Sequence, residues 1–319
     1  MSGLASWLER IWYGGAPPPR ILRALASLYA LALNRRRPFN TERLPVPVLV
    51  IGNFSVGGTG KTPLIIALAG HLRDRGYRPG VVSRGYGRRR RQPHSVAPDS
   101  TPEQAGDEPL LIARRTGVPV RVDADRLAAA RFLIAQGCDV IIADDGLQHR
   151  NLPRTCEIEV LDAGRRYGNG RLLPAGPLRE PVRAVDLRVV NGAAADVDGA
   201  YAMSMQPGLC RNLRDGRVRP LDGFRGQKVQ AVAGIGNPER FFSSLRQSGL
   251  AVDTHVFPDH HAFRTDDLPG GTVLLTEKDA VKCAPFAHAD VWAVPVEARL
   301  SDAFFERLAA LLPAARSMP

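Results

Sequence analysis

Short apolar runs alternate with amphipathic stretches along most of the chain. Runs of apolar residues predict buried strands at residues 47–51, 80–83, 119–122, 140–143 and 187–190. Stretches with apolar residues at helical spacing lie between them, at residues 64–75, 108–116 and 125–136. Strands that alternate with helices indicate an α/β fold, with a mostly parallel sheet that helices cover on both faces.

The same alternation returns on a smaller scale after residue 222, with predicted strands at 229–233, 252–256, 272–276 and 291–294 and a helix near 239–248. Between the two sets, Leu213 and Val218 flank Asp215-Gly216, a two-residue turn signal that predicts a hairpin. We therefore expect four parts: an N-terminal helical segment (1–40), a large α/β domain (41–202), a hairpin linker (203–222) and a smaller C-terminal α/β domain (223–319).

The N-terminal segment contains an apolar stretch, residues 21–33, that only Arg23 and Ser27 interrupt and that three arginines at 35–37 follow. It is shorter than the roughly 20 residues that a membrane-spanning helix needs. One interpretation is an ordinary packed helix. The other is a helix at a membrane surface, with arginines on anionic lipid and aromatic side chains at headgroup depth, namely Trp7, Trp12, Tyr13 and Tyr29.

Composition narrows the classes of protein. The 319 residues, 44% of them hydrophobic, suffice for a buried core and two domains. The net charge of +11 suits phosphate-rich partners: nucleic acid, anionic membrane or phosphorylated ligands. An aromatic content of 6% without a basic stripe argues against nucleic acid. Four widely spaced cysteines indicate neither a zinc site nor disulfides, and we expect a cytoplasmic protein without a signal peptide.

The stretch SVGGTGKT resembles a phosphate-binding loop, except that Ser55 stands where the pattern has its first glycine. A strand precedes it and a helix follows, as such loops require. Backbone N–H groups and the helix N-terminus would hold the phosphates, Lys61 would reach their oxygens, and the Thr62 hydroxyl would bind Mg²⁺. We predict that nucleotide is bound by Ser55, Val56, Gly57, Gly58, Thr59, Gly60, Lys61 and Thr62.

A second motif, VIIADDGLQH at residues 140–149, consists of an apolar strand followed by two aspartates. Carboxylates at this place in phosphate-loop proteins hold Mg²⁺ directly or through water. Asp144 and Asp145 both qualify, and two adjacent acids are costly unless a cation neutralises them. The residues thus predict a site for a nucleotide and Mg²⁺.

Phosphoryl transfer also needs a residue that takes the proton of the acceptor. One candidate pair, Asp107 and Glu108, lies in AGDEP; another group, Asp259, His260 and His261, lies in FPDHHAF. An aspartate polarised by a histidine would be a suitable base for a sugar hydroxyl. Each motif is also typical of plain helix capping or a turn.

Taken together, seven motifs resemble those of the tetraacyldisaccharide 4'-kinase family, which acts in lipid A biosynthesis in Gram-negative bacteria. They are LPVPVLVIGNFSVGGTGKTP, VVSRGYGRR, AGDEP, DDGLQHR, GRLLPAGPLREP, FPDHHAF and TEKDAVK, and they span residues 44–282. The resemblance implies a phosphate-loop fold, ATP and Mg²⁺ as cofactors, and an acylated disaccharide phosphate lipid as the acceptor. It also implies an enzyme at the cytoplasmic face of the inner membrane, and it favours the membrane-surface interpretation of residues 21–33.

The resemblance assigns roles to individual residues. It implies that Asp107 is the catalytic base with His260 as its partner, although His261 is an alternative partner. Lys61 would act in catalysis as well as binding, and Thr62, Asp144, Asp145 and Glu180 would hold the metal. Six further residues lie in or near the family motifs, and the resemblance does not decide whether each contacts ATP or the lipid. They are Arg84, Arg126, Gln148, His149, Arg171 and Arg179.

An alternative function shares most of these features: a membrane-associated phosphate-loop ATPase that acts as a switch through protein partners. Such a switch needs neither Asp107 with His260 nor the arginine-rich segment GRLLPAGPLREP. The kinase is therefore the better interpretation, with no nucleic acid partner expected and protein partners unknown.

Overall fold

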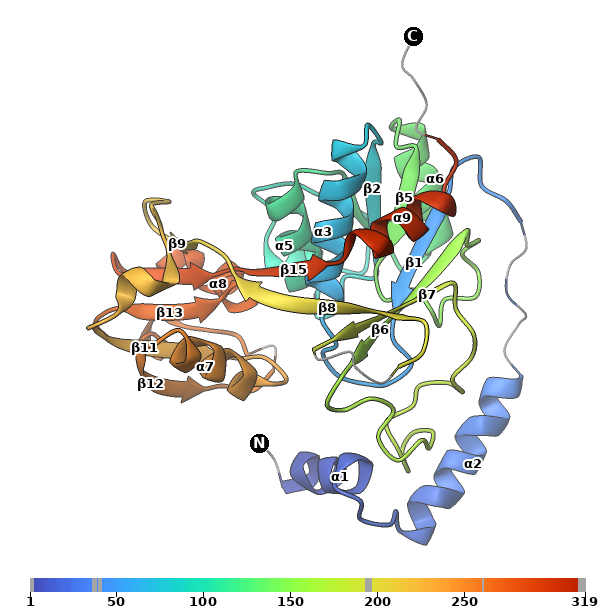
Figure 1. The fold of residues 1–319 in the computed structure, drawn as a ribbon, viewed down its shortest axis with the longest axis horizontal. Helices are drawn as coiled ribbons and strands as arrows, with labels where there is room; N and C mark the ends of the chain where they lie inside the picture. Colours follow the sequence, from blue (N-terminus) through green and yellow to red (C-terminus); the bar gives the residue numbers. More distant parts are fainter. Residues whose placement is uncertain (1–2, 36–38, 40–41, 193–196, 260, 315–319) are drawn as a thin grey trace. The chain divides into compact units, whose positions relative to one another are not determined.

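The structure, a computed structural model, describes residues 3–35, 39, 42–192, 197–259 and 261–314 (Figure 1). The chain divides into two compact units. The first unit comprises residues 1–84, 123–204 and 300–319, and the second comprises residues 85–122 and 205–299. Residues 85–122 therefore pack with the C-terminal part of the chain, whereas the sequence analysis placed them in the large domain.

The first unit contains parallel strands in the order β8-β7-β6-β1-β5-β2. Their bounds are β1 Val48–Gly52, β2 Pro79–Ser83, β5 Val140–Ala143, β6 Cys156–Asp162, β7 Leu187–Asn191 and β8 Ala200–Pro207. Val48 and Val50 of β1 pack with Ala130 and Leu133 of α6 (Arg126–Ala135). Because successive side chains of a strand point to opposite faces, Leu49 and Ile51 lie on the other face.

The remaining helices of the first unit are α1 Gly3–Tyr13, α2 Arg20–Asn34, α3 Lys61–Asp74 and α9 Asp302–Ala310. The predicted strands β1, β2, β5 and β7 and the predicted helices α2, α3 and α6 are confirmed. Strand β6 was missed: it carries Glu157 and Glu159, which are buried and form ion pairs with the half-buried Arg183 and Arg188. Charged residues do not normally mark a buried strand, so the apolar pattern gave no signal.

The second unit contains a sheet in the order β10-β9-β14-β13-β11-β12. Its strands are β9 Cys210–Asn212, β10 Val218–Arg219, β11 Lys228–Ala233, β12 Ala251–Val256, β13 Val273–Thr276 and β14 Val291–Val294. The predicted hairpin is present as β9 and β10, and it forms one end of this sheet through pairing of β9 with β14. The core gathers Phe224, Phe242 and Trp292.

Residues 94–122 complete the second unit, with β3 His94–Val96 and β4 Val120–Val122 antiparallel and α4 Pro102–Ala105 and α5 Asp107–Thr116 between them. Helix α5 packs on α8 (Glu277–Cys283) through a small apolar cluster of Ala105, Leu110 and Val281. The other described elements are helix α7 (Pro238–Gln247), strand β15 (Val296–Leu300) and short 3-10 helices at Leu221–Phe224, Thr265–Asp267 and Ala284–Phe286. Burial of apolar groups far apart in sequence thus decides where residues 85–122 belong.

Helix α2 packs by one face and exposes the other. Leu33 is buried, and the Tyr29 hydroxyl donates a 2.7 Å hydrogen bond to the carbonyl of Arg179. Trp12 Nε1 of α1 likewise donates to the carbonyl of Pro174 at 3.0 Å. The polar groups of Trp12 and Tyr29, which the sequence analysis placed at lipid headgroups, therefore bind the protein's own backbone. None of the described helices combines the length and apolar character that crossing a bilayer demands.

Candidate functional site

The candidate site of the first unit lies where parallel strands end. Strand β1 leads into the phosphate loop, residues 55–62, and α3 begins at Lys61. Val50 of β1 is paired with Ala143 of β5, so Asp144 and Asp145 follow at the same edge. Gly52 is paired with Glu159 of β6 on the other side. Ligands of open α/β sheets bind at this carboxyl edge.

The loop backbone explains why a serine is tolerated at its first position. Gly57 and Gly60 have φ values of 109° and 99°, which side-chain-bearing residues rarely adopt. Among the described residues other than glycine, Asp145 and Arg166 have a positive φ, and Ser55 does not. Ser55 instead forms a bridge with Leu178. The first loop position therefore needs no glycine.

Lys61 lies among oxygen atoms at the start of α3. Its Nζ donates to Asn53 Oδ1 at 2.8 Å and lies 3.4 Å from Asp145 Oδ1. Arg179 donates to both carboxylate oxygens of Asp145, at 2.8 and 3.0 Å. Burial opposes ionisation of Asp145, but Lys61 and Arg179 outweigh it and hold the pKa of that carboxyl well below its usual range. The three side chains form a charged cluster beside the loop.

The two aspartates that the sequence treats alike have different surroundings. Asp144 is buried and accepts a hydrogen bond of 2.8 Å from the Ser83 hydroxyl at the end of β2. The carboxylate of Asp145 pairs with the side chains of Lys61 and Arg179, and its backbone takes a left-handed conformation with φ of 48°. Arg126 is buried; burial lowers the pKa of its guanidinium, while Asp144 and Asp145 oppose that shift.

Glu180 and Gln148, predicted for metal and substrate, contact each other. Gln148 Nε2 donates to Glu180 Oε1 at 3.0 Å and to the carbonyl of Asn53 at 3.1 Å. Glu180 is 2% exposed, and Thr62 is half-buried in the first turn of α3. Carboxylate and hydroxyl oxygens are ligands that Mg²⁺ accepts, and Mg²⁺ usually keeps waters and phosphate oxygens as its other ligands. The donor set therefore fits a partly hydrated Mg²⁺, although the described residues contain no group of three or more His, Cys, Asp or Glu placed to enclose a metal.

His149 follows Gln148 and is neutral at pH 7. Burial, together with the nearby charge of Arg126, lowers its pKa to about 4. Its Nε2 is buried and has no hydrogen-bond partner among the described residues. Arg84 and Arg171, which were predicted to bind substrate, are exposed.

Three polar residues of the site were missed from the sequence: Asn53 and Ser83, described above, and Asn191. Asn191 ends β7, and its Nδ2 donates to the carbonyl of Thr59 in the loop at 2.9 Å. Asn191 and Ser83 are each the last residue of a strand, as the carboxyl edge requires. Their position at the end of a predicted strand could have indicated from the sequence that they belong to the site.

A second group of charged residues lies within the second unit, between α5 and α8. Lys282 Nζ lies 2.8 Å from Asp279 Oδ1 and 3.9 Å from Asp107 Oδ2. Lys278 lies between Glu108 and Asp259, at 3.2 and 3.7 Å. Burial would lower the pKa of Lys278, but these acids outweigh it and raise that pKa. The structure thus brings Asp107, Glu108 and Asp259 together around two lysines.

His260, predicted as the partner of Asp107, lies outside the described residues. Its neighbour His261 has a different partner: the ring Nε2 is 3.0 Å from Asp267 Oδ2. The His261 ring also packs against Phe257 and Phe263. His261 is therefore engaged with Asp267, and the role of His260 stays a prediction.

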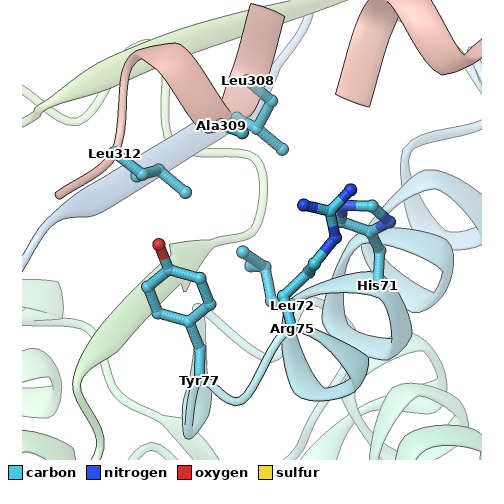
Figure 2. Close-up of a pocket in the computed structure, with 7 residues that line it drawn as sticks. All are labelled: His71, Leu72, Arg75, Tyr77, Leu308, Ala309 and Leu312. Atoms are coloured by element: carbon cyan, nitrogen blue, oxygen red, sulfur yellow. The ribbon is translucent and has the colours of Figure 1, made fainter. Parts of the chain in front are cut away.

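A cavity of about 200 Å³ lies at the far end of α3 from the phosphate loop (Figure 2). Its lining comes from the end of α3, the following turn and α9: His71, Leu72, Arg75, Tyr77, Leu308, Ala309 and Leu312. His71 stacks on Phe305, and the Tyr77 hydroxyl donates to the carbonyl of Pro313. These contacts fasten α9 to α3, so the cavity is part of a packing interface.

Comparisons with known proteins point in one direction. The model of the tetraacyldisaccharide-1-P 4'-kinase family matches residues 19–313. The tetraacyldisaccharide 4'-kinase of Stenotrophomonas maltophilia (strain R551-3) is 51% identical, over 97% of each chain. That of Nitrosococcus oceani is 49% identical, over 98% of this chain and 96% of its own.

A solved structure agrees with these relatives. The crystal structure of LpxK from Aquifex aeolicus in complex with ATP has a TM-score of 0.77 and 30% sequence identity, and the match covers 91% of this chain and 98% of that one. The phosphate loop, the acids at the strand ends and the match along nearly the whole length lead to one conclusion: the chain belongs to the tetraacyldisaccharide-1-P 4'-kinase family.

Proposed function

We propose that the chain transfers the γ-phosphate of ATP to the 4'-hydroxyl of tetraacyldisaccharide 1-phosphate, a step of lipid A biosynthesis. The observation that carries this proposal is the charged cluster of Lys61, Asp145 and Arg179 beside a phosphate loop at the carboxyl edge of the sheet. It occurs in a chain that the family model matches from residue 19 to 313. The ATP complex of the Aquifex aeolicus protein supports ATP as the donor.

The loop residues would bind the phosphates of ATP. Gly57 and Gly60 allow the wrapped backbone whose N–H groups hold an anion, and Lys61 adds a positive charge at the start of α3. Because Lys61 is already held by Asn53 and Asp145, its ammonium group is positioned before ATP binds. Thr62, Asp144, Asp145 and Glu180 are the residues that would hold Mg²⁺. When bound, this ion neutralises charge on the phosphate oxygens.

Asp107 would accept the proton of the acceptor. In the transfer, a bond forms between the 4'-oxygen and the γ-phosphorus while the bond from that phosphorus to the bridging oxygen of ADP breaks. The electron pair of that bond leaves with ADP, and the hydroxyl proton passes to Asp107, with His260 as its proposed partner. Lys282 Nζ lies 3.9 Å from Asp107 Oδ2.

The acceptor carries acyl chains, and the exposed face of α2 suits a membrane surface. Ile21, Leu25, Leu28 and Leu31 follow one another at helical spacing and are 45–69% exposed. Such a stripe on a helix with basic residues is typical of interfacial helices. We therefore propose that α2 attaches the enzyme to the cytoplasmic face of the inner membrane.

A single assay tests the function. Purified protein is incubated with γ-labelled ATP, Mg²⁺ and an acylated glucosamine disaccharide 1-phosphate in mixed micelles, and labelled lipid is separated from free phosphate. We expect label on the lipid, and far less of it with Lys61→Ala. The disaccharide blocked at its 4'-hydroxyl is the matched control. Release of free phosphate that does not depend on the lipid, with no labelled lipid, would contradict the kinase and favour an ATPase switch.

A further inference from the structure

Arg165 starts from the same edge of the sheet as the phosphate loop. Strand β6, which pairs with β1, ends at Asp162, and the chain then turns. Asp162 Oδ1 accepts hydrogen bonds from the backbone N–H groups of Gly164 and Arg165, at 3.1 and 2.9 Å. The start of the Arg165 side chain is therefore fixed beside the nucleotide site.

The end of the side chain lies against the phosphate loop. Its Nη1 lies 3.4 Å from the point that a Cβ atom would occupy at Gly57. Gly57 has a φ of 109°, and Gly57 and Gly58 are exposed, so this part of the loop backbone is open. The positive φ favours a glycine at position 57, and the guanidinium group lies within van der Waals range of this position.

Helix α1 holds this guanidinium group in place. Arg165 Nη2 donates to Glu9 Oε1 at 2.8 Å, and the guanidinium carbon lies 5.4 Å from the centre of the Tyr13 ring. The side chains of Arg165 and Glu9 are 29% and 41% exposed. An ion pair this exposed contributes little to stability. Its effect is to fix the direction of a long, flexible side chain.

Two other arginines of the site are held by its aspartates or buried near them. Arg179 binds both oxygens of Asp145, and Arg126 is buried near Asp144. In phosphoryl transfer, charge spreads over the oxygens of the γ-phosphoryl group in the transition state. In some phosphate-loop enzymes an arginine, supplied by the same chain or by a partner protein, stabilises this charge. Arg165 has the right chemistry and the right neighbour for that task.

We propose that Arg165 is a further catalytic residue of the phosphoryl transfer, whose guanidinium group binds the γ-phosphoryl oxygens, and that Glu9 of α1 orients it. This inference rests on the proposed kinase function. It assigns α1 a role in the reaction, because the residue that orients Arg165 belongs to the N-terminal segment. Glu9 acts through Arg165 and is a positioning residue.

The test compares two ion pairs of equal length. Arg165→Ala, Arg165→Lys and Glu9→Gln change the proposed pair; Arg131→Ala and Glu42→Gln change a pair that is also 2.8 Å long but joins α6 to Glu42. Two readouts are taken: kcat and KM for ATP with the lipid acceptor, and the affinity for a fluorescent ADP with and without aluminium fluoride. ADP with aluminium fluoride imitates the transferring phosphoryl group, so it requires the groups that bind the transition state.

We expect Arg165→Ala to lower kcat by about a hundredfold to a thousandfold, as the loss of one group that stabilises transition-state charge does. Its affinity for ADP alone should equal that of the wild type, whereas the tighter binding with aluminium fluoride should be lost. Arg165→Lys keeps a charge but not the planar fork, and we expect it to recover part of kcat. Added guanidinium ion should also partly restore Arg165→Ala. Glu9→Gln should lower kcat less, and both control variants should behave as the wild type.

A wild-type kcat and a wild-type response to aluminium fluoride in Arg165→Ala would overturn the inference. Equal losses of ADP affinity and kcat in both Arg165→Ala and Arg165→Lys would also overturn it, because they would indicate a structural role. Failure of the proposed function is a separate result: it would appear in the wild-type protein as the absence of labelled lipid.

Discussion

Replacement of Asp279 by alanine should strongly destabilise the second unit. This carboxylate is fully buried at the start of α8. It accepts hydrogen bonds from the backbone N–H of Gly234, at 2.8 Å, and from the Thr276 hydroxyl, at 2.7 Å, and it lies 2.8 Å from Lys282 Nζ. One side chain thus joins β11, β13 and α8.

The magnitude follows from what the substitution leaves behind. The Lys282 side chain is 9% exposed, so Asp279→Ala leaves a buried ammonium group whose remaining acid, Asp107, is 3.9 Å away. Removing one partner of a buried ion pair costs about 3–5 kcal/mol. The N–H of Gly234 adds about 1–3 kcal/mol if it stays unsatisfied. Because Lys282 can turn to Asp107, we expect a total loss of about 4 kcal/mol, within the range set by these two principles.

Native-state hydrogen exchange read on peptides from β11 and β13 is the suitable assay, since it reports the second unit separately from the first. Asp279→Ala combined with Lys282→Met should recover most of the loss, because the buried ammonium group is then removed together with the carboxylate that paired with it. Glu239→Ala, which breaks the exposed pair with Arg246, is the control and should cost at most about 1 kcal/mol. A loss below about 1 kcal/mol in Asp279→Ala, or a double variant less stable than the single one, would refute the reasoning.

Other predictions concern binding, catalysis and pH. Lys61→Ala should abolish most binding of fluorescent ATP and most turnover, and near wild-type turnover would contradict the assigned loop. Ile21→Gln with Leu28→Gln should release protein from anionic vesicles in a sedimentation assay, whereas Leu209→Gln, at a residue that is also exposed but belongs to the second unit, should not. Asp107→Ala should lower kcat by about a hundredfold with ATP affinity unchanged, and added His260→Ala should cost little more if the two act as a unit. Because His149 has a pKa of about 4 in the folded state and near 6.5 when unfolded, acidification through that window protonates the unfolded state first and lowers stability. His149→Gln should therefore flatten the fall in urea midpoint between pH 7 and pH 5, and an unchanged slope would show that burial of His149 is not its source.

Local patterns carried the prediction of the α/β architecture and of the phosphate loop. The strands β1 and β5 are continuous apolar runs because both of their faces are buried, and that is visible in the sequence. Gly57, Gly60 and Lys61 lie within a few residues of one another, so their spacing, with a strand before and a helix after, predicts a phosphate site.

Contacts between distant residues decided the rest. Strand β6 is buried with its glutamates because Arg188 and Tyr167 neutralise and bind Glu159, and no window of sequence contains that pairing. Asp144 and Asp145 differ because of their partners in the folded chain. Ser83 at the end of β2 binds Asp144, and Arg179 binds Asp145. A partner that is distant in sequence lowers the free energy cost of burying a charged side chain and decides which contacts that side chain makes.

The pair of Glu9 and Arg165 shows the same limit most clearly. The two residues are 156 positions apart, and each is an unremarkable charge in its own segment. Their partnership depends on where α1 packs and where β6 ends, which the burial of apolar surface determines across the whole first unit. Periodicity reports how a segment folds, whereas the free energy of packing decides which segments meet, and a site built from several segments depends on the second.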